Sequence, residues 1–163
     1  MTDKLSVMVV DDEPLARDEL RFLLGEVGDI EVVAEASNGS EAIARFEEHR
    51  PHAVFVDLRM PGPDGLALSE ALLSRAPNLA IVVVSAHDEG AMRGYDVGVV
   101  DYVLKPPRLP RVRTAVERIR ARLDQDAPAL ASGEGKLERL AVRRRGQYVV
   151  LDVKDVVYFE MKD

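Results

Sequence analysis

Short apolar runs rich in β-branched residues recur along the first 124 residues, and a segment with helical periodicity follows each run. Such uninterrupted runs are typical of parallel strands that are buried on both faces. Repetition of strand and then helix favours parallel strands joined by right-handed crossovers. The sequence therefore predicts an α/β fold with a doubly wound, five-stranded parallel sheet, whose apolar strand runs are residues 7–10, 32–33, 54–56, 81–84 and 102–104.

The helical segments carry boundary signals of different strength. Asn38 and Glu41 have the spacing of a capping box, in which each residue's side chain bonds the other's backbone N–H. The helix expected at about His87 to Tyr95 is weakly patterned and contains Gly90 and Gly94, so we expect it to be the least stable. The other helices are expected to begin at Pro14, at Asp64-Gly65 and at Leu109.

Four of the five runs end at a polar residue, and the residue types differ. The first run ends at Asp11-Asp12, and the others at Asp57, Ser85 and Lys105. In a doubly wound sheet, sites form at the carboxyl ends of the strands, near the topological switch point. We therefore expect the fold to bring these groups together, as carboxylates, a hydroxyl and an ammonium that could hold a divalent cation and transfer a phosphoryl group to an aspartate.

Each of these residues also has an ordinary structural interpretation. Asp57 could be a turn former or helix cap, Asp11-Asp12 could cap the first helix, and Ser85 and Lys105 could be a strand terminator and a solvated lysine. Three neighbouring carboxylates would, however, repel one another unless a cation lay between them. Mg²⁺ prefers oxygen ligands of this kind, and the Pro- and Gly-rich loop after Asp57 could fix the Arg59 carbonyl as a further ligand.

Four segments together resemble the receiver domain of bacterial two-component response regulators. They are Val9–Glu13, Val56–Gly65, Ser85-Ala86 and Asp101–Pro106, and the resemblance covers roughly residues 4–124. It implies a receiver domain over residues 1–124 with the flavodoxin-like strand order 2-1-3-4-5. It also implies that a sensor histidine kinase is the partner from which Asp57 accepts a phosphoryl group.

The same resemblance assigns roles to the other strand-end residues. Asp12, Asp57 and the Arg59 backbone carbonyl would ligate Mg²⁺, and Asp11 would assist through water. Lys105 and Ser85 would contact the phosphate. Ser85 and Tyr102 would form the switch pair that reports phosphorylation, although a tyrosine such as Tyr102, considered alone, is more often a core residue than a switch.

Beyond residue 124 the pattern changes. Residues 125–136 are rich in Gly, Pro and small side chains, which is typical of a linker. Residues 137–163 contain two β-branched runs around Gly146 and then a third run, so we expect a short C-terminal β segment. This segment resembles the start of a LytTR-type DNA-binding domain that the chain leaves incomplete. The resemblance implies DNA as a partner of the intact protein, but not of this chain.

Composition restricts where in the cell we expect the protein and which classes of partner we expect it to bind. The chain of 163 residues has no cysteine, no apolar stretch long enough to cross a bilayer and no signal-peptide pattern, so we expect a cytoplasmic protein with no membrane partner. Residues 1–124 contain 15 Lys and Arg against 22 Asp and Glu. This excess of acidic residues argues against binding of a nucleic-acid backbone by the first domain alone.

The resemblance also suggests how the output would work. Phosphorylation would shift the population of shapes of the face formed by the fourth helix, the fifth strand and the fifth helix. In many receivers that face forms a homodimer. Here acidic residues of one copy could pair with arginines of the other across a two-fold axis, the candidates being Asp96 and Asp101 with Arg111, Arg118 or Arg122.

Two other functions fit parts of the pattern. A phosphatase of the haloacid dehalogenase type also uses an aspartate nucleophile at a strand end with Mg²⁺, but it needs a second aspartate two residues later, where this chain has Arg59. A receiver that acts only through protein–protein contacts would need no DNA-binding domain. We expect a phosphoacceptor switch and not an enzyme, because its only chemistry would be gain and loss of its own phosphoryl group.

Overall fold

The computed structural model describes residues 4–88 and 91–125, which form alternating strands and helices. The strands are β1 (Leu5–Val10), β2 (Ile30–Ala36), β3 (Ala53–Asp57), β4 (Ala80–Ser85) and β5 (Asp101–Leu104). The helices are α1 (Pro14–Val27), α2 (Gly39–His49), α3 (Gly65–Arg75), α4 (Ala91–Val97) and α5 (Leu109–Gln125). All strand pairs are parallel, and the sheet order is β2-β1-β3-β4-β5, which confirms the predicted fold.

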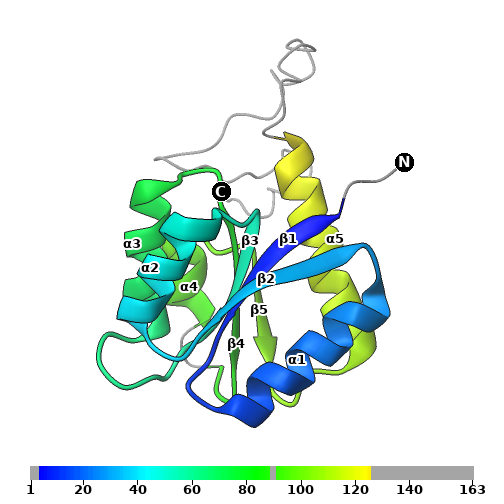
Figure 1. Ribbon diagram of the computed structural model, residues 1–163, viewed down its shortest axis with the longest axis horizontal. Helices are drawn as coiled ribbons and strands as arrows, with labels where there is room; N and C mark the ends of the chain where they lie inside the picture. Colours follow the sequence, from blue (N-terminus) through cyan, green and yellow to red (C-terminus); the bar gives the residue numbers. More distant parts are fainter. Residues whose placement is uncertain (1–3, 89–90, 126–163) are drawn as a thin grey trace. The chain divides into compact units, whose positions relative to one another are not determined.

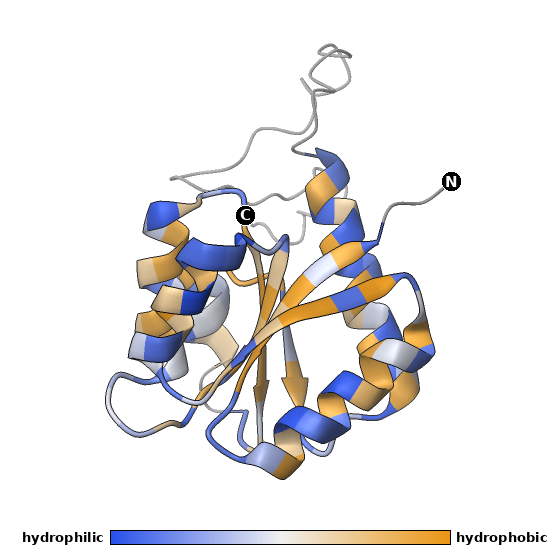
Figure 2. Cartoon of the chain, viewed as in Figure 1, coloured by the Kyte–Doolittle hydropathy of each residue, from blue (hydrophilic) through white to orange (hydrophobic). Residues whose placement is uncertain are grey.

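The sheet lies between two layers of helices, with α1 and α5 on one face and α2, α3 and α4 on the other (Figure 1). Alternate residues of each strand point to opposite faces, so the strands supply two separate apolar cores. Val7 and Val9 pack in the core under α1 and α5, whereas Met8 and Val10 pack in the core under the other three helices. Figure 2 shows the resulting apolar strands between two layers of amphipathic helices. Burial on both faces explains why the central strands β1, β3 and β4 read as continuous apolar runs, whereas the edge strand β2 is mostly half-buried and includes Glu31 and Glu35.

The predicted capping box of α2 forms only in part. The Asn38 side chain accepts a hydrogen bond from the Glu41 backbone N–H at 2.8 Å, as predicted. The Glu41 carboxylate, however, accepts from the backbone N–H and the hydroxyl of Ser37, both at 2.8 Å, and not from Asn38. A serine hydroxyl one residue earlier offers a second donor, and these hydrogen bonds hold the pKa of Glu41 below its usual range.

Helix α4 differs from the prediction. It is a seven-residue helix that begins at Ala91, whereas the sequence pattern placed its start near His87. The Ala91 backbone N–H bonds to the Asp88 carbonyl at 3.1 Å, so His87 and Asp88 precede the helix. Gly94 is buried, and a β-carbon there would lie 3.4 Å from the Val99 side chain. This distance is an ordinary van der Waals contact, so the packing of α4 does not by itself require glycine at position 94.

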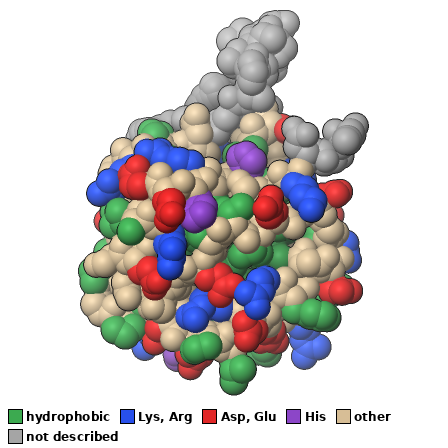
Figure 3. All heavy atoms as spheres, viewed as in Figure 1, with side chains coloured by type: hydrophobic (Ala, Val, Ile, Leu, Met, Phe, Trp, Pro, Cys, Tyr) green, Lys and Arg blue, Asp and Glu red, His purple; other side chains and the backbone are tan. Residues whose placement is uncertain are grey.

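On the face seen in Figure 3, acidic and basic side chains are interspersed and no single charge sign dominates. Within the described ranges, none of the helices has both the length and the apolar character that crossing a membrane requires. The predicted linker beyond Gln125 and the predicted β segment at 137–163 lie outside the described residues.

Candidate metal and phosphoacceptor site

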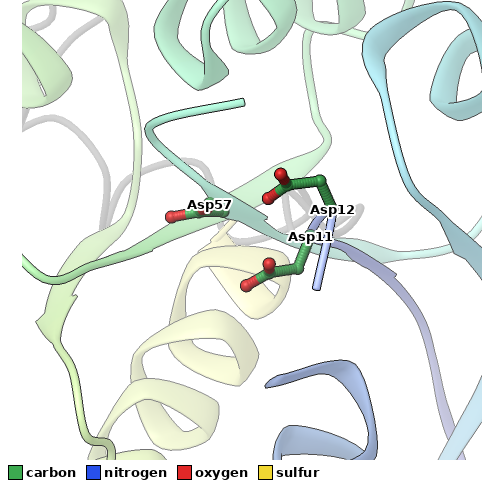
Figure 4. Close-up of side chains that lie close together, drawn as sticks. All are labelled: Asp11, Asp12 and Asp57. Carbon is green, nitrogen blue, oxygen red and sulfur yellow. The ribbon is translucent and has the colours of Figure 1, made fainter. Parts of the chain in front are cut away.

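Three carboxylates meet at the carboxyl edge of the sheet, where β1 and β3 lie side by side. Asp11 and Asp12 follow β1, Asp57 ends β3, and one carboxylate oxygen of each lies within 4.8 Å of the others (Figure 4). Asp11 and Asp57 are buried, and Asp12 is exposed. The spacing suits oxygen ligation of a small divalent cation, because each carboxylate offers one oxygen to a group of close oxygens.

Lys105 completes this cluster from the end of β5. Its Nζ lies 2.8 Å from Asp11 Oδ2 and 3.5 Å from Asp57 Oδ1. Its backbone N–H donates to the Ser85 carbonyl at 2.8 Å, which fixes the loop that carries the ammonium. The sequence prediction that the strand ends bring these groups together therefore holds for Asp11, Asp12, Asp57 and Lys105.

The three carboxylates of the cluster carry more negative charge than the single Lys105 ammonium can neutralise. Burial raises the pKa of Asp57; the Lys105 ammonium opposes this, the charge of Asp11 adds to it, and the net pKa lies above its usual range. Burial alone would lower the pKa of Lys105, but its hydrogen bond to Asp11 and the surrounding negative charge raise it overall. A bound cation would favour the ionised form of all three carboxylates.

The loop after β3 turns back tightly over Asp57. The Gly65 backbone N–H donates to the Leu58 carbonyl at 2.7 Å, and the Asp64 side chain caps α3 by accepting from the Leu66 and Ala67 N–H groups at 3.0 and 2.9 Å. A β-carbon at position 65 would lie 2.2 Å from the Asp57 carbonyl oxygen. Arg59 lies in this loop, and the role of its carbonyl as a metal ligand stays a prediction.

The two predicted switch residues both hold the backbone of His87. Ser85 is buried, and its Oγ accepts from the His87 N–H at 3.1 Å. Tyr102 is also buried, and its hydroxyl donates to the His87 carbonyl at 2.7 Å. Sequence reasoning missed this role of His87, because a backbone group leaves no signal in residue identity.

A family model described as a response regulator receiver domain matches residues 7–117. The chain belongs to the response regulator receiver family. It is 33% identical over 161 residues to the positive alginate biosynthesis regulatory protein of Pseudomonas aeruginosa, covering 95% of this chain and 65% of that protein. It is 29% identical over 164 residues to the sensory transduction protein LytT of Bacillus cereus, covering 98% of this chain and 67% of that protein.

A solved structure gives the same fold for the receiver. The REC domain of AraT, a response regulator from Geobacillus stearothermophilus, superposes with a TM-score of 0.68 and 36% sequence identity. The superposition covers 75% of this chain and 97% of that domain. The chain spans less than two thirds of the length of the first curated relatives that it matches.

A second polar cluster lies in the receiver at the start of β5, away from the three carboxylates. Asp101 is fully buried and accepts two hydrogen bonds from the Arg111 guanidinium, both at 2.8 Å, and a third from Arg118 at 2.7 Å. Arg111 also donates to the Tyr102 carbonyl at 3.0 Å. These contacts are within one chain, and the pairing of Asp101 with arginines across a two-fold axis stays a prediction. Arginines seven residues apart lie on one face of α5, and that spacing could have indicated the cluster.

We expect Asp101→Asn to lower the free energy of unfolding of the receiver by about 2 kcal/mol at pH 7, because two guanidinium groups lose their charged acceptor. Burial raises the pKa of Asp101, but the arginines lower it more, so the folded pKa lies below its usual range. Its stabilisation is therefore complete above the unfolded pKa, about 4, and is lost as the pH falls through the folded pKa. Chemical denaturation of both proteins between pH 7 and pH 3 would measure this.

The exposed Asp96 supplies the matched control, because it lies on neighbouring α4. Asp96→Asn is expected to change the free energy of unfolding by less than about 0.5 kcal/mol. A difference between wild type and Asp101→Asn that stayed constant down to pH 3 would show that the ionised carboxylate of Asp101 is not the source of the stabilisation.

Proposed function

We propose that this chain is the phosphorylation-dependent receiver of a two-component response regulator, and that Asp57 accepts a phosphoryl group from a sensor histidine kinase. The supporting observation is the buried Asp57 carboxylate beside Lys105, at the end of β3, in a site with two further carboxylates. An Asp57 oxygen would form a bond to phosphorus while the bond from phosphorus to the histidine nitrogen breaks, leaving an acyl phosphate. Incubation with acetyl phosphate and Mg²⁺, followed by intact mass, tests the proposal.

The residues present suit Mg²⁺. Asp12 and Asp57 with the Arg59 carbonyl would hold it directly, and Asp11 would hold it through water, since both Asp11 oxygens already accept hydrogen bonds, from the Glu13 N–H and from Lys105. The cation would supply charge neutralisation on the phosphoryl oxygens. Lys105, which lies between Asp11 and Asp57, would contact one phosphate oxygen, and Ser85 would contact another.

The switch would work through His87. If the Ser85 hydroxyl turns to the phosphate, the His87 N–H loses the acceptor that it has here. The β4–α4 loop would then be free to rearrange, and Tyr102 would retain or lose its bond to the His87 carbonyl according to the position of that loop. The β4–α4 loop would thus be a two-state element, and the phosphoryl group would shift the populations of its two states. The chain would modify itself and would have no other substrate.

We propose transcription regulation through a LytTR DNA-binding domain as the output of the intact protein, in the cytoplasm. Support comes from residues 137–163, which resemble the start of such a domain. The relatives named above, an alginate biosynthesis regulator and LytT, also match this chain beyond the receiver, over 95% and 98% of its length. A receiver that acts only through protein contacts remains the second candidate and would show no DNA binding by the intact protein.

The face formed by α4, β5 and α5 is the proposed homodimer contact. Three large apolar side chains are exposed on it, Met92 by 77%, Tyr95 by 50% and Leu104 by 49%. Because Asp101 is satisfied within its own chain, these apolar residues, and not ion pairs of Asp101, would carry the association. Exposed apolar side chains that lie together often mark such contacts.

We expect beryllofluoride with Mg²⁺, which mimics the phosphoryl group on an aspartate, to raise the molar mass of the chain from monomer to dimer in size-exclusion chromatography with light scattering. Leu104→Glu is expected to weaken this dimer at least tenfold, because a charge would be buried against apolar residues. Phe22→Glu is the matched control: Phe22 is 65% exposed, but it lies on α1. An unchanged mass after beryllofluoride addition would overturn dimerisation driven by phosphorylation.

A further inference from the structure

Asp12 differs from the other two carboxylates of the site in how it is held. The Asp11 carboxylate accepts from the Glu13 N–H at 2.9 Å and from Lys105 at 2.8 Å, and Asp57 pairs with Lys105. The Asp12 carboxylate has no hydrogen bond or ion pair with any residue in the ranges 4–88 and 91–125. Within these ranges, the place from which the Asp12 side chain starts is therefore set by its backbone alone.

Arg17, one turn into α1, holds that backbone. Its Nη1 donates to the Asp11 carbonyl oxygen at 2.6 Å, and its Nε donates to Glu35 Oε1 at 3.1 Å. Glu35 projects from β2 and is bound on its other oxygen by Arg21. The Arg17 side chain is only 19% exposed, so its guanidinium is fixed between the loop and the sheet.

The Asp11 carbonyl belongs to the peptide that joins Asp11 to Asp12. Because a peptide is planar, fixing the direction of this carbonyl also fixes the plane that enters Asp12. The Asp11 N–H is held by the Ala36 carbonyl at 3.0 Å, so the segment is fixed on both sides of Asp11. Two contacts lie next to Asp12: Arg17 holds the peptide before it, and the Asp11 carboxylate holds the N–H of the peptide after it at 2.9 Å. Of these two, the contact from Arg17 is the one made by a residue outside the Asp11–Glu13 segment.

We infer that Arg17 is a positioning residue of the metal site, which orients Asp12 through the Asp11–Asp12 peptide. The inference rests on the proposed use of Asp12 as a cation ligand. Arg17 could change the cation affinity of the site in either of two opposite directions. A guanidinium close to a cation site opposes cation binding through charge repulsion, whereas a guanidinium that orients a ligand favours binding. Removing Arg17 thus tightens binding if charge dominates and weakens it if orientation dominates.

Binding of Mn²⁺ alone, followed by electron paramagnetic resonance, tests the inference without any phosphoryl transfer, since Mn²⁺ accepts the same oxygen ligands as Mg²⁺. We expect Arg17→Gln to raise the dissociation constant about tenfold, the lower end of the range for loss of a group that orients a ligand. Arg21→Gln is the matched control, because it removes a cation from the same helix and a partner of Glu35 but no contact to Asp11. It should change the constant less than about twofold.

A double-mutant cycle with Asp12→Asn separates orientation of Asp12 from general damage. If Arg17 acts through Asp12, Arg17→Gln in the Asp12→Asn background should change Mn²⁺ affinity less than about twofold. Arg17→Lys keeps the charge but cannot form both fixed contacts, so it should weaken Mn²⁺ binding as Arg17→Gln does. It replaces the glutamine variant in this test if that variant does not fold.

Three results would overturn the inference: tighter binding by Arg17→Gln, unchanged binding, or a tenfold loss that persists without the Asp12 carboxylate. Failure of the wild-type chain to bind Mn²⁺ would overturn the proposed metal site itself. Normal binding by wild type with no effect of Arg17 would leave the metal site in place and remove only the role of Arg17.

Discussion

Asp57→Asn is expected to abolish the gain of one phosphoryl group that the wild-type chain shows after incubation with acetyl phosphate and Mg²⁺. The amide keeps the shape of the side chain but cannot attack phosphorus as an anion. Intact-mass spectrometry of the two proteins measures the effect directly. Because acyl phosphate formation needs an ionised oxygen at this position, the loss should be complete and not partial.

The control for Asp57→Asn is Asp18→Asn, which removes an exposed carboxylate of α1 that pairs with Arg21. It should be phosphorylated as fully as wild type. Equal mass gain in Asp57→Asn and wild type would show that another residue is the acceptor and would overturn the proposed function. Release of inorganic phosphate over many turnovers from a generic phosphate ester would instead favour a phosphatase, despite Arg59 at the position where such an enzyme needs an aspartate.

Most of the receiver could be predicted from the sequence because its strands are buried on both faces. A parallel strand buried on both faces is mostly apolar, with the buried Asp101 at the start of β5 as an exception, so its end is visible as a polar residue, as at Asp57 and Lys105. The strand ends then meet at one edge of the sheet for topological reasons. The cluster of three carboxylates with Lys105 follows from these two facts, and the structure brings all four together.

One feature that the sequence did not predict, the hold on His87, depends on contacts between side chains and backbone. His87 is held through its N–H and its carbonyl, which every residue possesses, so nothing in the identity of residue 87 marked it. These contacts also help explain why α4 begins at Ala91 and not near His87. For Asp101, the receiver resemblance predicts arginine partners across a dimer, whereas the structure buries it at the start of β5 and pairs it with Arg111 and Arg118 of its own chain.

The Asp57 backbone depends on a residue eight positions later in the chain, which has no chemical role of its own. Gly65 begins α3 directly against the end of β3, and a β-carbon on it would lie 2.9 Å from the Leu58 Cα as well as 2.2 Å from the Asp57 carbonyl oxygen. Backbone atoms of a central strand cannot turn aside as a side chain can. Glycine at position 65 therefore allows the phosphoacceptor strand and α3 to lie in contact.

Gly65→Ala is accordingly expected to lower the free energy of unfolding by about 3 kcal/mol, the upper part of the range for overpacking in a core, and to lower the melting temperature by about 10 °C. It should also slow phosphorylation of Asp57 by acetyl phosphate, because relief of the clash must move the Asp57 carbonyl or the start of α3. Thermal unfolding and the rate of mass gain measure the two effects.

Gly25→Ala is the matched control. Gly25 lies inside α1, is exposed, and has nothing within 4 Å of the position that a β-carbon would take. Alanine there should stabilise the receiver by about 0.5 to 1 kcal/mol, since glycine is a poor helix former, and should leave the phosphorylation rate unchanged. If Gly65→Ala were as stable as wild type, the backbone of Asp57 would have to shift at little cost in free energy. A rigid end of β3 could then not be what places the carboxylate against Lys105 and the other two acids.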